Sequence, residues 1–252
     1  MSVKILVIGE QCVDKFVYCN TKRLSPEAPV PVLNPIRTTK NPGMAGNTLA
    51  NARALAPDYF TMSLGQNEPI TKTRYVEEKS NHMFLRLDEG EDKITPFKWT
   101  MDIDVLIGQA DIVIVSDYNK GFLSNGDLKE IARKSKLSIL DSKRKLTNEI
   151  AKSFTFVKLN DSERNNNPDL TTDNIIVTLG KKGAEYQDVL YISPNPQDTI
   201  DVSGAGDTFT AAFIVKYFQL RDESAAIRFA NHKAAEVVSK RGVVVPDLDT
   251  PE

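Results

Sequence analysis

The chain has 252 residues, of which 40% are hydrophobic and 26% are charged, as in folded globular proteins of one or two domains. Its 32 basic and 34 acidic residues leave a formal net charge of −2, without the basic excess typical of nucleic-acid-binding domains. The two cysteines, Cys12 and Cys19, lack the spacing of a metal site or disulfide framework. We therefore expect a cytoplasmic protein with no nucleic-acid partner and no membrane span.

Short apolar runs alternate with helical patterns along most of the chain. The runs that predict buried strands are Val3–Ile8, Ile112–Val115, Leu137–Leu140, Phe154–Leu159 and Ile175–Leu179. The segments with helical periodicity are Ala45–Leu55, Asn125–Lys134, Thr208–Leu220 and Ser224–Ser239. This alternation predicts an α/β fold with a mostly parallel sheet covered by helices on both faces, and ligands beyond the carboxyl ends of the strands.

Two segments interrupt the alternation. Residues 15–37 are Pro-rich and extended, and residues 70–88 show two alternating strands around a polar turn. Together they predict a small antiparallel sheet beside the main domain, suited to an active-site lid or a dimer contact. A surface hairpin without a functional role is the alternative. We expect residues 1–252 to form a single domain that carries this β lid.

The strongest motif is Asp201–Thr208 (DVSGAGDT), which directly precedes a predicted helix. Glycines at a helix N-terminus let unpaired N–H groups approach an anion, so Gly204, Ala205 and Gly206 predict a cradle for a phosphate. Asp207 would stand in the first turn and accept the proton of a hydroxyl that attacks a γ-phosphate. For this motif alone, a helix cap with a tight turn is the alternative.

Further motifs occur together with this one in the order seen in ribokinase-like (pfkB family) carbohydrate kinases, and the chain resembles that family from end to end. These motifs are Gly43–Asn47 (GMAGN), Asn160–Glu163 (NDSE) and Thr178–Gly183 (TLGKKG). Within the family, four stretches are most similar to the D-glycero-β-D-manno-heptose 7-phosphate kinases of lipopolysaccharide-core synthesis: Arg23–Val32 (RLSPEAPVPV), Ile70–Arg74, Leu85–Asp88 and Ser116–Gly121.

The resemblance implies an ATP-dependent kinase that converts heptose 7-phosphate to the 1,7-bisphosphate with Mg²⁺ as cofactor. A kinase for another sugar or a nucleoside, or a degenerate member that only binds sugar or nucleotide, are the alternatives. In many bacteria this kinase is fused to a nucleotidyltransferase domain. We expect no such domain here after Pro246.

The resemblance also implies a role for each matching residue. Asp207 would be the catalytic base, and Gly204, Ala205 and Gly206 the anion hole. The residues implied in sugar binding are Asp14, Gly43 and Asn47. Those implied around the nucleotide are Asn160, Thr178, Gly180, Gly183 and Asn231, with Glu163 organising Mg²⁺. Taken singly, Asp14 could be an ordinary strand-end carboxylate, Asn47 a helix-start residue and residues 180–183 a hairpin turn.

Four cations are candidates for holding the phosphate that a sugar phosphate already carries: Lys72, Arg74, Arg86 and Lys143. For any one of them, solvated surface charge is the alternative.

The chain departs from the family pattern at two places. The segment between Leu55 and Ile70 is too short for an α/β unit that relatives carry, although Tyr59–Leu64 can supply its core strand. We expect an exposed apolar patch or a partner chain there. Met44 replaces the second glycine of a usual pair, which adds a side chain where relatives bring backbone close to the sugar. The alternating strands of the lid also predict a homodimer.

Overall fold

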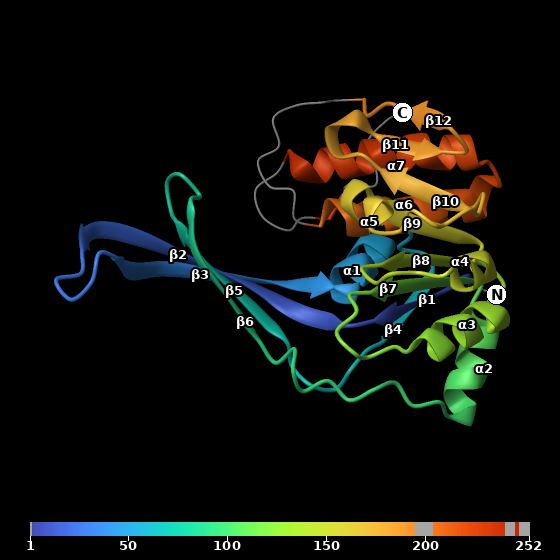
Figure 1. The fold of residues 1–252 in the computed structure, drawn as a ribbon, viewed down its shortest axis with the longest axis horizontal. Helices are drawn as coiled ribbons and strands as arrows, with labels where there is room; N and C mark the ends of the chain where they lie inside the picture. The colour runs from blue at the N-terminus through green and yellow to red at the C-terminus, as the bar shows by residue number, and fades with distance from the viewer. Residues whose placement is uncertain (1, 195–203, 240–244, 247–252) are drawn as a thin grey trace.

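The computed structural model describes residues 2–194, 204–239 and 245–246, and its centre is an eight-stranded sheet (Figure 1). In sheet order its strands are β12 (Val189–Tyr191), β11 (Ala184–Tyr186), β10 (Ile175–Thr178), β9 (Phe156–Asn160), β8 (Ser138–Ser142), β7 (Ile112–Asp117), β1 (Lys4–Gly9) and β4 (Phe60–Leu64). The pairs from β4 to β10 are parallel, and β11 and β12 join in antiparallel fashion. Asp201, Val202 and Ser203 lie outside the described residues.

Side chains of the central strands point alternately into two helical layers, as the geometry of a strand requires. Ile5 and Val7 of β1 pack with α1 (Ala45–Leu55), α6 (Ala205–Leu220) and α7 (Glu223–Val238). Leu6 and Ile8 pack on the other face with α2 (Met101–Gln109), α3 (Asn125–Lys134) and α4 (Asn148–Ser153). The mostly parallel sheet with helices on both faces is thus confirmed. None of the helices in the described part of the chain is long and apolar enough to cross a bilayer.

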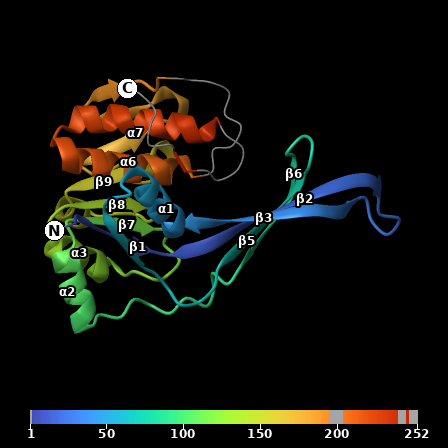
Figure 2. The ribbon, with the colours of Figure 1, turned by 180° about the vertical axis from the view of Figure 1, so that it is seen from behind.

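A second sheet of four strands projects from this body as a long arm (Figure 2). Its order is β3 (Pro31–Met44), β2 (Gln11–Leu24), β5 (Thr71–Glu77) and β6 (Met83–Glu89). The lid sheet is present as expected, but its first hairpin extends beyond residues 15–37 and β2 pairs with β5 in parallel. β3 is an edge strand, which explains how it tolerates three prolines, Pro31, Pro35 and Pro42.

The short connection after α1 leaves β4 at the edge of the main sheet. Phe60 of β4 is 56% exposed, whereas Met62 and Leu64 are half-buried. Arg53 of α1 donates to the Thr61 hydroxyl at 3.0 Å and covers part of the open edge. The chain between β6 and α2 covers the neighbouring face with three apolar residues, Ile94, Phe97 and Trp99. On β4, the apolar exposure expected from the missing unit is therefore confined to Phe60.

Candidate active site

The glycine turn lies at the start of α6, a 16-residue helix. Gly204 occupies the N-cap with φ 86°, a left-handed conformation that favours glycine. A Cβ on Gly206 would lie 2.9 Å from Nζ of Lys158, so glycine leaves space for that lysine. Because the first N–H groups of a helix have no intrahelical acceptor and lie at the positive end of its dipole, this turn can hold an anion.

Asp207 is buried in the first turn of α6, and both of its carboxylate oxygens accept hydrogen bonds. Asn47 of α1 donates Nδ2–H to Oδ2 at 2.8 Å, and the Tyr118 hydroxyl donates to Oδ1 at 3.0 Å. Burial, followed by the charge of Asp141, raises the pKa of Asp207 to about 6, against the lowering effects of Asn47, Lys158 and Tyr118. Asp207 is therefore largely ionised at neutral pH yet remains a usable proton acceptor.

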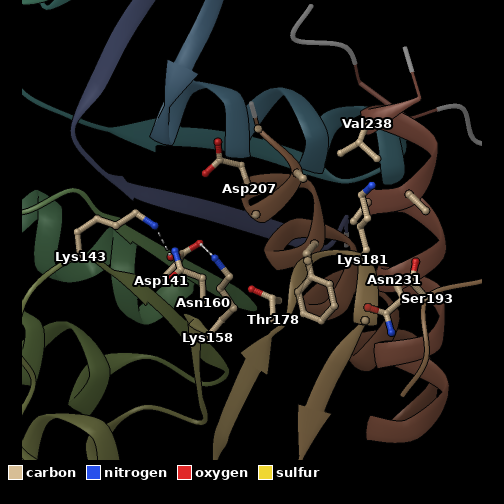
Figure 3. A pocket seen from close by; sticks show the side chains of 18 of the residues that line it. Asp141, Lys143, Lys158, Asn160, Thr178, Lys181, Ser193, Asp207, Asn231 and Val238 are labelled. Atoms are coloured by element: carbon tan, nitrogen blue, oxygen red, sulfur yellow. Dashed lines mark hydrogen bonds and ion pairs between the residues drawn. The ribbon is translucent and has the colours of Figure 1, made fainter. Parts of the chain in front are cut away.

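A cavity of about 450 Å³ opens beside Asp207 (Figure 3). Ten of the predicted site residues line it: Lys143, Asn160, Thr178, Gly180, Gly183, Gly204, Ala205, Gly206, Asp207 and Asn231. Lys143, Asp141 and Lys158 gather at one end, and Asn231 lies toward the other. The charged end meets the helix N-terminus, which is the arrangement needed to place the phosphates of a nucleotide next to Asp207.

Asp141, at the end of β8, links the lysines on the floor of this charged end. Its Oδ2 accepts from Nζ of Lys158 and from the Thr210 hydroxyl, both at 3.0 Å. Its Oδ1 lies 3.7 Å from Nζ of Lys143, which also pairs with Glu163. Burial lowers the pKa of Lys143, but the Asp141 and Glu163 carboxylates outweigh burial and raise it above its usual value. Lys143 therefore stays protonated and can attract phosphate oxygens.

Among the described residues, no group of three or more His, Cys, Asp or Glu side chains could hold a metal ion. Mg²⁺, however, is commonly held by only one or two carboxylates together with phosphate oxygens and water. Oδ1 of Asp141 is buried and has no hydrogen-bond donor. Glu163 belongs to α5 (Asp161–Asn165), where it forms a capping box with Asn160: Asn160 N–H donates to Oε2 at 2.7 Å, and Glu163 N–H donates to Asn160 Oδ1 at 2.8 Å. Asp141 and Glu163 are therefore the residues that would hold the cation, directly or through water.

Comparison with known proteins agrees with this geometry. Residues 145–251 match the family described as pfkB family carbohydrate kinase. The bifunctional protein HldE of Nitratiruptor sp. is 26% identical over 300 residues, covering 100% of this chain and 65% of that protein. HldE of Azorhizobium caulinodans is 30% identical over 299 residues, covering 96% of this chain and 62% of that protein. The chain is thus similar to pfkB family carbohydrate kinases through residues 145–251, and to HldE proteins over its whole length.

The chain spans less than two thirds of these two HldE relatives. Their aligned stretches are longer than the 252 residues of this chain, which fits the short segment before β5. The ribokinase of Arabidopsis thaliana, solved with ribose and ATP, shares the fold with a TM-score of 0.72 at 18% identity, covering 98% of this chain and 97% of that one. The ribokinase-like fold expected from the motifs is thus confirmed.

On the lid side of the site, Asp14 of β2 pairs with Arg74 of β5. Gly43 lies opposite Cys12 in the β2–β3 ladder, and a Cβ on Gly43 would come within 2.2 Å of Asp14 Oδ2. Burial raises the pKa of Cys12 to about 12, and Asp14 and Asp207 both add to this effect. The predicted sugar residue and the predicted base therefore lie within electrostatic reach of one thiol. Asp14, Gly43 and Asn47 do not line the cavity described above.

The candidate cations for a sugar phosphate all have carboxylate partners in this structure. Lys72 lies 2.9 Å from Glu91, Arg86 forks onto Asp88 at 2.8 and 2.7 Å, and Arg74 and Lys143 pair as described. Lys72, Arg74 and Arg86 belong to adjoining lid strands, whereas Lys143 follows β8. When a sugar phosphate binds to these cations, its phosphate oxygens would replace the carboxylates as their partners.

The nucleotide side of the site surrounds a glycine turn between β10 and β11. Thr178 ends β10, and Gly180 begins a single 3₁₀ turn, η1 (Gly180–Lys182). Gly183 has φ 105°, and a Cβ there would lie 2.0 Å from the carbonyl oxygen of Tyr191. Asn231 of α7 donates to that same carbonyl at 2.8 Å. The segment 180–183 is thus both a hairpin connection and a wall of the cavity.

Four residues of the site were absent from the sequence-based assignment: Glu10, Tyr118, Asp141 and Lys158. Glu10 is fully buried, and its Oε2 accepts Tyr118 N–H and its Oε1 accepts Lys120 N–H, both at 2.9 Å. Glu10, Tyr118 and Asp141 lie at the carboxyl ends of parallel strands, and Lys158 interrupts an apolar run. Strand-end position was a usable signal for three of them.

Proposed function

We propose that this protein transfers the γ-phosphoryl group of ATP to a hydroxyl of a sugar. The observation that carries the proposal is the position of Asp207: a buried carboxylate at a helix N-terminus, between a cavity with a cationic end and the residues of the lid. The match of residues 145–251 to the pfkB family of carbohydrate kinases supports the same reaction class. ATP would lie along η1 and α7, with its terminal phosphates at the start of α6.

In this reaction Asp207 would orient the accepting hydroxyl and take its proton as the new oxygen–phosphorus bond forms and the bond to ADP breaks. The N–H groups of residues 204–206 would bind the oxygens of the transferred group, and Lys143 and Lys158 would add positive charge beside it. Bound Mg²⁺ supplies further neutralisation of the phosphate charge. The lid would exclude water, which favours transfer to sugar over hydrolysis.

We further propose heptose 7-phosphate as the acceptor and the anomeric hydroxyl as the reacting group. This rests on the similarity to HldE proteins and on the paired cations of the lid, Lys72, Arg74 and Arg86. The acceptor side also holds Met44 in place of the glycine that the resemblance implies, which favours a second candidate, a kinase for a different sugar. Cys12 and Cys19 are both free and buried, which supports a reducing, cytoplasmic setting.

The lid supports a homodimer as a further part of the proposal. Leu85 and Leu87 lie on one face of β6 and are 54% and 44% exposed, so this face is apolar and open. Met83 lies beyond a bulge in the β5–β6 ladder and is 50% exposed. Residues 26–30 at the tip of the β2–β3 hairpin are also exposed. A second lid packed on this face would bury both features.

The function is tested by measuring ADP release from Mg-ATP with heptose 7-phosphate, fructose 6-phosphate, ribose and adenosine as separate acceptors. We expect turnover with the heptose phosphate and a product whose new phosphate is on the anomeric oxygen, identified by ³¹P NMR. Turnover with only ribose or only adenosine would contradict heptose 7-phosphate as the acceptor, but would still support phosphoryl transfer from ATP. ATP binding without acceptor-dependent ADP release would contradict the kinase proposal and support a binding protein.

A further inference from the structure

Met44 adopts a backbone conformation that L-residues rarely occupy. It has φ 57° and ψ −135° at the N-cap of α1, and its side chain makes no capping hydrogen bond. Glycine would occupy this conformation without strain, because it has no Cβ. A methionine here therefore carries a conformational cost that its side chain must offset.

The backbone on both sides of Met44 is held in place. Met44 lies opposite Gln11 in the β2–β3 ladder, and Ala45 N–H donates to the Glu10 carbonyl at 2.9 Å. The chain also changes from strand to helix at this residue. Since these contacts fix the backbone, the strain cannot relax by a shift of residue 44 alone, and the site accepts methionine only in the strained conformation.

The Met44 side chain is 4% exposed and packs with Cys12 and Ile70, against which Tyr118 also packs. Three features relate this cluster to the reacting centre. Tyr118 donates to one oxygen of Asp207, Asn47 in the same helix as Met44 donates to the other, and Gly43 next to Met44 packs against Asp14. The thioether thus packs beside Cys12, which lies within electrostatic reach of both Asp14, proposed to hold the sugar, and Asp207, proposed to deprotonate it.

We infer that Met44 is a specificity-determining residue, which limits the size of the acceptor next to the hydroxyl that is phosphorylated. This inference rests on the proposed sugar kinase activity. Besides the hydroxyl and the two ring bonds, the anomeric carbon of a cyclic aldose carries a hydrogen, whereas that of a cyclic ketose carries a hydroxymethyl group. Met44 selects the aldose because its side chain occupies the volume that the hydroxymethyl group needs.

The test compares heptose 7-phosphate with its ketose isomer, sedoheptulose 7-phosphate, on the wild type and on Met44→Gly and Met44→Ala. Both variants open the same volume, and only glycine also removes the backbone strain. We expect the ratio of kcat/KM for ketose over aldose to rise at least tenfold in both variants, chiefly through KM for the ketose. We also expect Met44→Gly to melt at a higher temperature than Met44→Ala.

Asn81→Gly is the matched control, because Asn81 also has a positive φ, 58°, but lies in the turn between β5 and β6. It should leave the acceptor ratio unchanged. A ratio that stays within twofold of the wild type in both Met44 variants overturns the inference, as does an equal loss for both sugars, which indicates a structural role alone.

Calorimetry with a non-hydrolysable ATP analogue and each sugar keeps this test separate from that of the kinase activity. If no variant releases ADP, the proposed function fails. The change in relative sugar affinity then still decides the role of Met44, and absence of sugar binding in every variant counts against it.

Discussion

Asp207 carries a negative charge in a buried position, where the ionised form is disfavoured. Its pKa of about 6 exceeds the ordinary value of 3.8, so the folded protein binds this proton more tightly than the unfolded chain does. Linkage gives the sign: the free energy of unfolding falls as the pH rises from about 3.8 to about 6, because the unfolded chain ionises there first. Above pH 6 the loss stays constant, and below pH 3.8 both states are protonated and the effect vanishes.

Asp207→Asn should therefore stabilise the protein while it abolishes turnover. An asparagine can accept from Asn47 and donate to the Tyr118 hydroxyl, so both contacts persist. We expect a gain of up to about 3 kcal/mol in the free energy of unfolding at pH 8, which declines between pH 6 and pH 4. Urea unfolding of Asp207→Asn and the wild type at pH 8 and pH 4 measures this gain in the free energy of unfolding. An equal gain at both pH values would show that the carboxylate charge is not its source.

Tyr118 holds one oxygen of Asp207 and favours its ionised form. Besides Tyr118, the titratable groups that act on Asp207 are Asp141 and Lys158, with Cys12 and Lys143 also in electrostatic reach. Tyr118→Phe leaves these groups in place and removes a bond that lowers the pKa. We expect the acidic limb of the kcat/KM profile to move to higher pH, and kcat/KM at pH 7 to fall roughly three- to tenfold.

The control for this profile is Tyr59→Phe, which removes a hydroxyl from a ring packed on Phe218 in the core. The acidic limb of the kcat/KM profile of Tyr59→Phe should stay at the wild-type pH. An unshifted limb in Tyr118→Phe, with activity lower at every pH, would reduce Tyr118 to a packing residue.

At the scale of elements, one side chain of the five-residue helix α5, Glu163, both caps the helix and is proposed to bind the cation. Glu163 closes the capping box of α5 and also pairs with Lys143. Glutamine keeps an oxygen for the Asn160 N–H but loses the charge. We expect Glu163→Gln to change the melting temperature by only a few degrees and to raise the Mg²⁺ concentration for half-maximal turnover about tenfold.

Titration of turnover with Mg²⁺ at fixed ATP measures this effect. Glu149→Gln, at an exposed position in the first turn of α4, is the matched control and should titrate as the wild type. An unchanged Mg²⁺ dependence in Glu163→Gln would remove Glu163 from the cation site.

Long elements with regular patterns could be predicted closely, whereas short ones could not. The bounds of α1 and α3 agree with the periodicity, and the central strands differ by one or two residues. α4 has six residues, and β11 and β12 have three each, which is too short for a period to emerge. The prolines of β3 concealed a fourteen-residue strand, because strand patterns do not show which strand will be at an edge.

For the site, too, a contiguous motif could be predicted from the sequence, whereas contacts between distant segments could not. Gly204–Asp207 is one contiguous turn, so its motif predicted its position. The bonds to Asp207 come from α1 and from the chain after β7, and the pair Asp141–Lys158 joins β8 to β9. Such contacts depend on strand order, which no local pattern specifies.

At the scale of the whole molecule, the lid carries apolar surface that the body does not cover. Leu85 is 54% exposed and lies on the same face of β6 as Leu87. Leu85→Lys should convert a dimer to a monomer, because a buried unpaired ammonium opposes association. Leu220→Lys, at the similarly exposed end of α6, is the control and should leave the mass unchanged. Light scattering measures both masses, and a monomeric wild type at working concentration would contradict the lid-mediated dimer.

The role of Asp207 is tested most directly by measuring ADP release and ATP binding by the wild type and Asp207→Ala under the same conditions. Asp207→Ala should lose at least a hundredfold in acceptor-dependent turnover, since the general base is removed. Its ATP affinity should stay within about threefold of the wild type, because the cavity wall and the N–H groups of α6 remain. Turnover above a tenth of the wild-type value in Asp207→Ala would contradict the central claim that Asp207 deprotonates the acceptor.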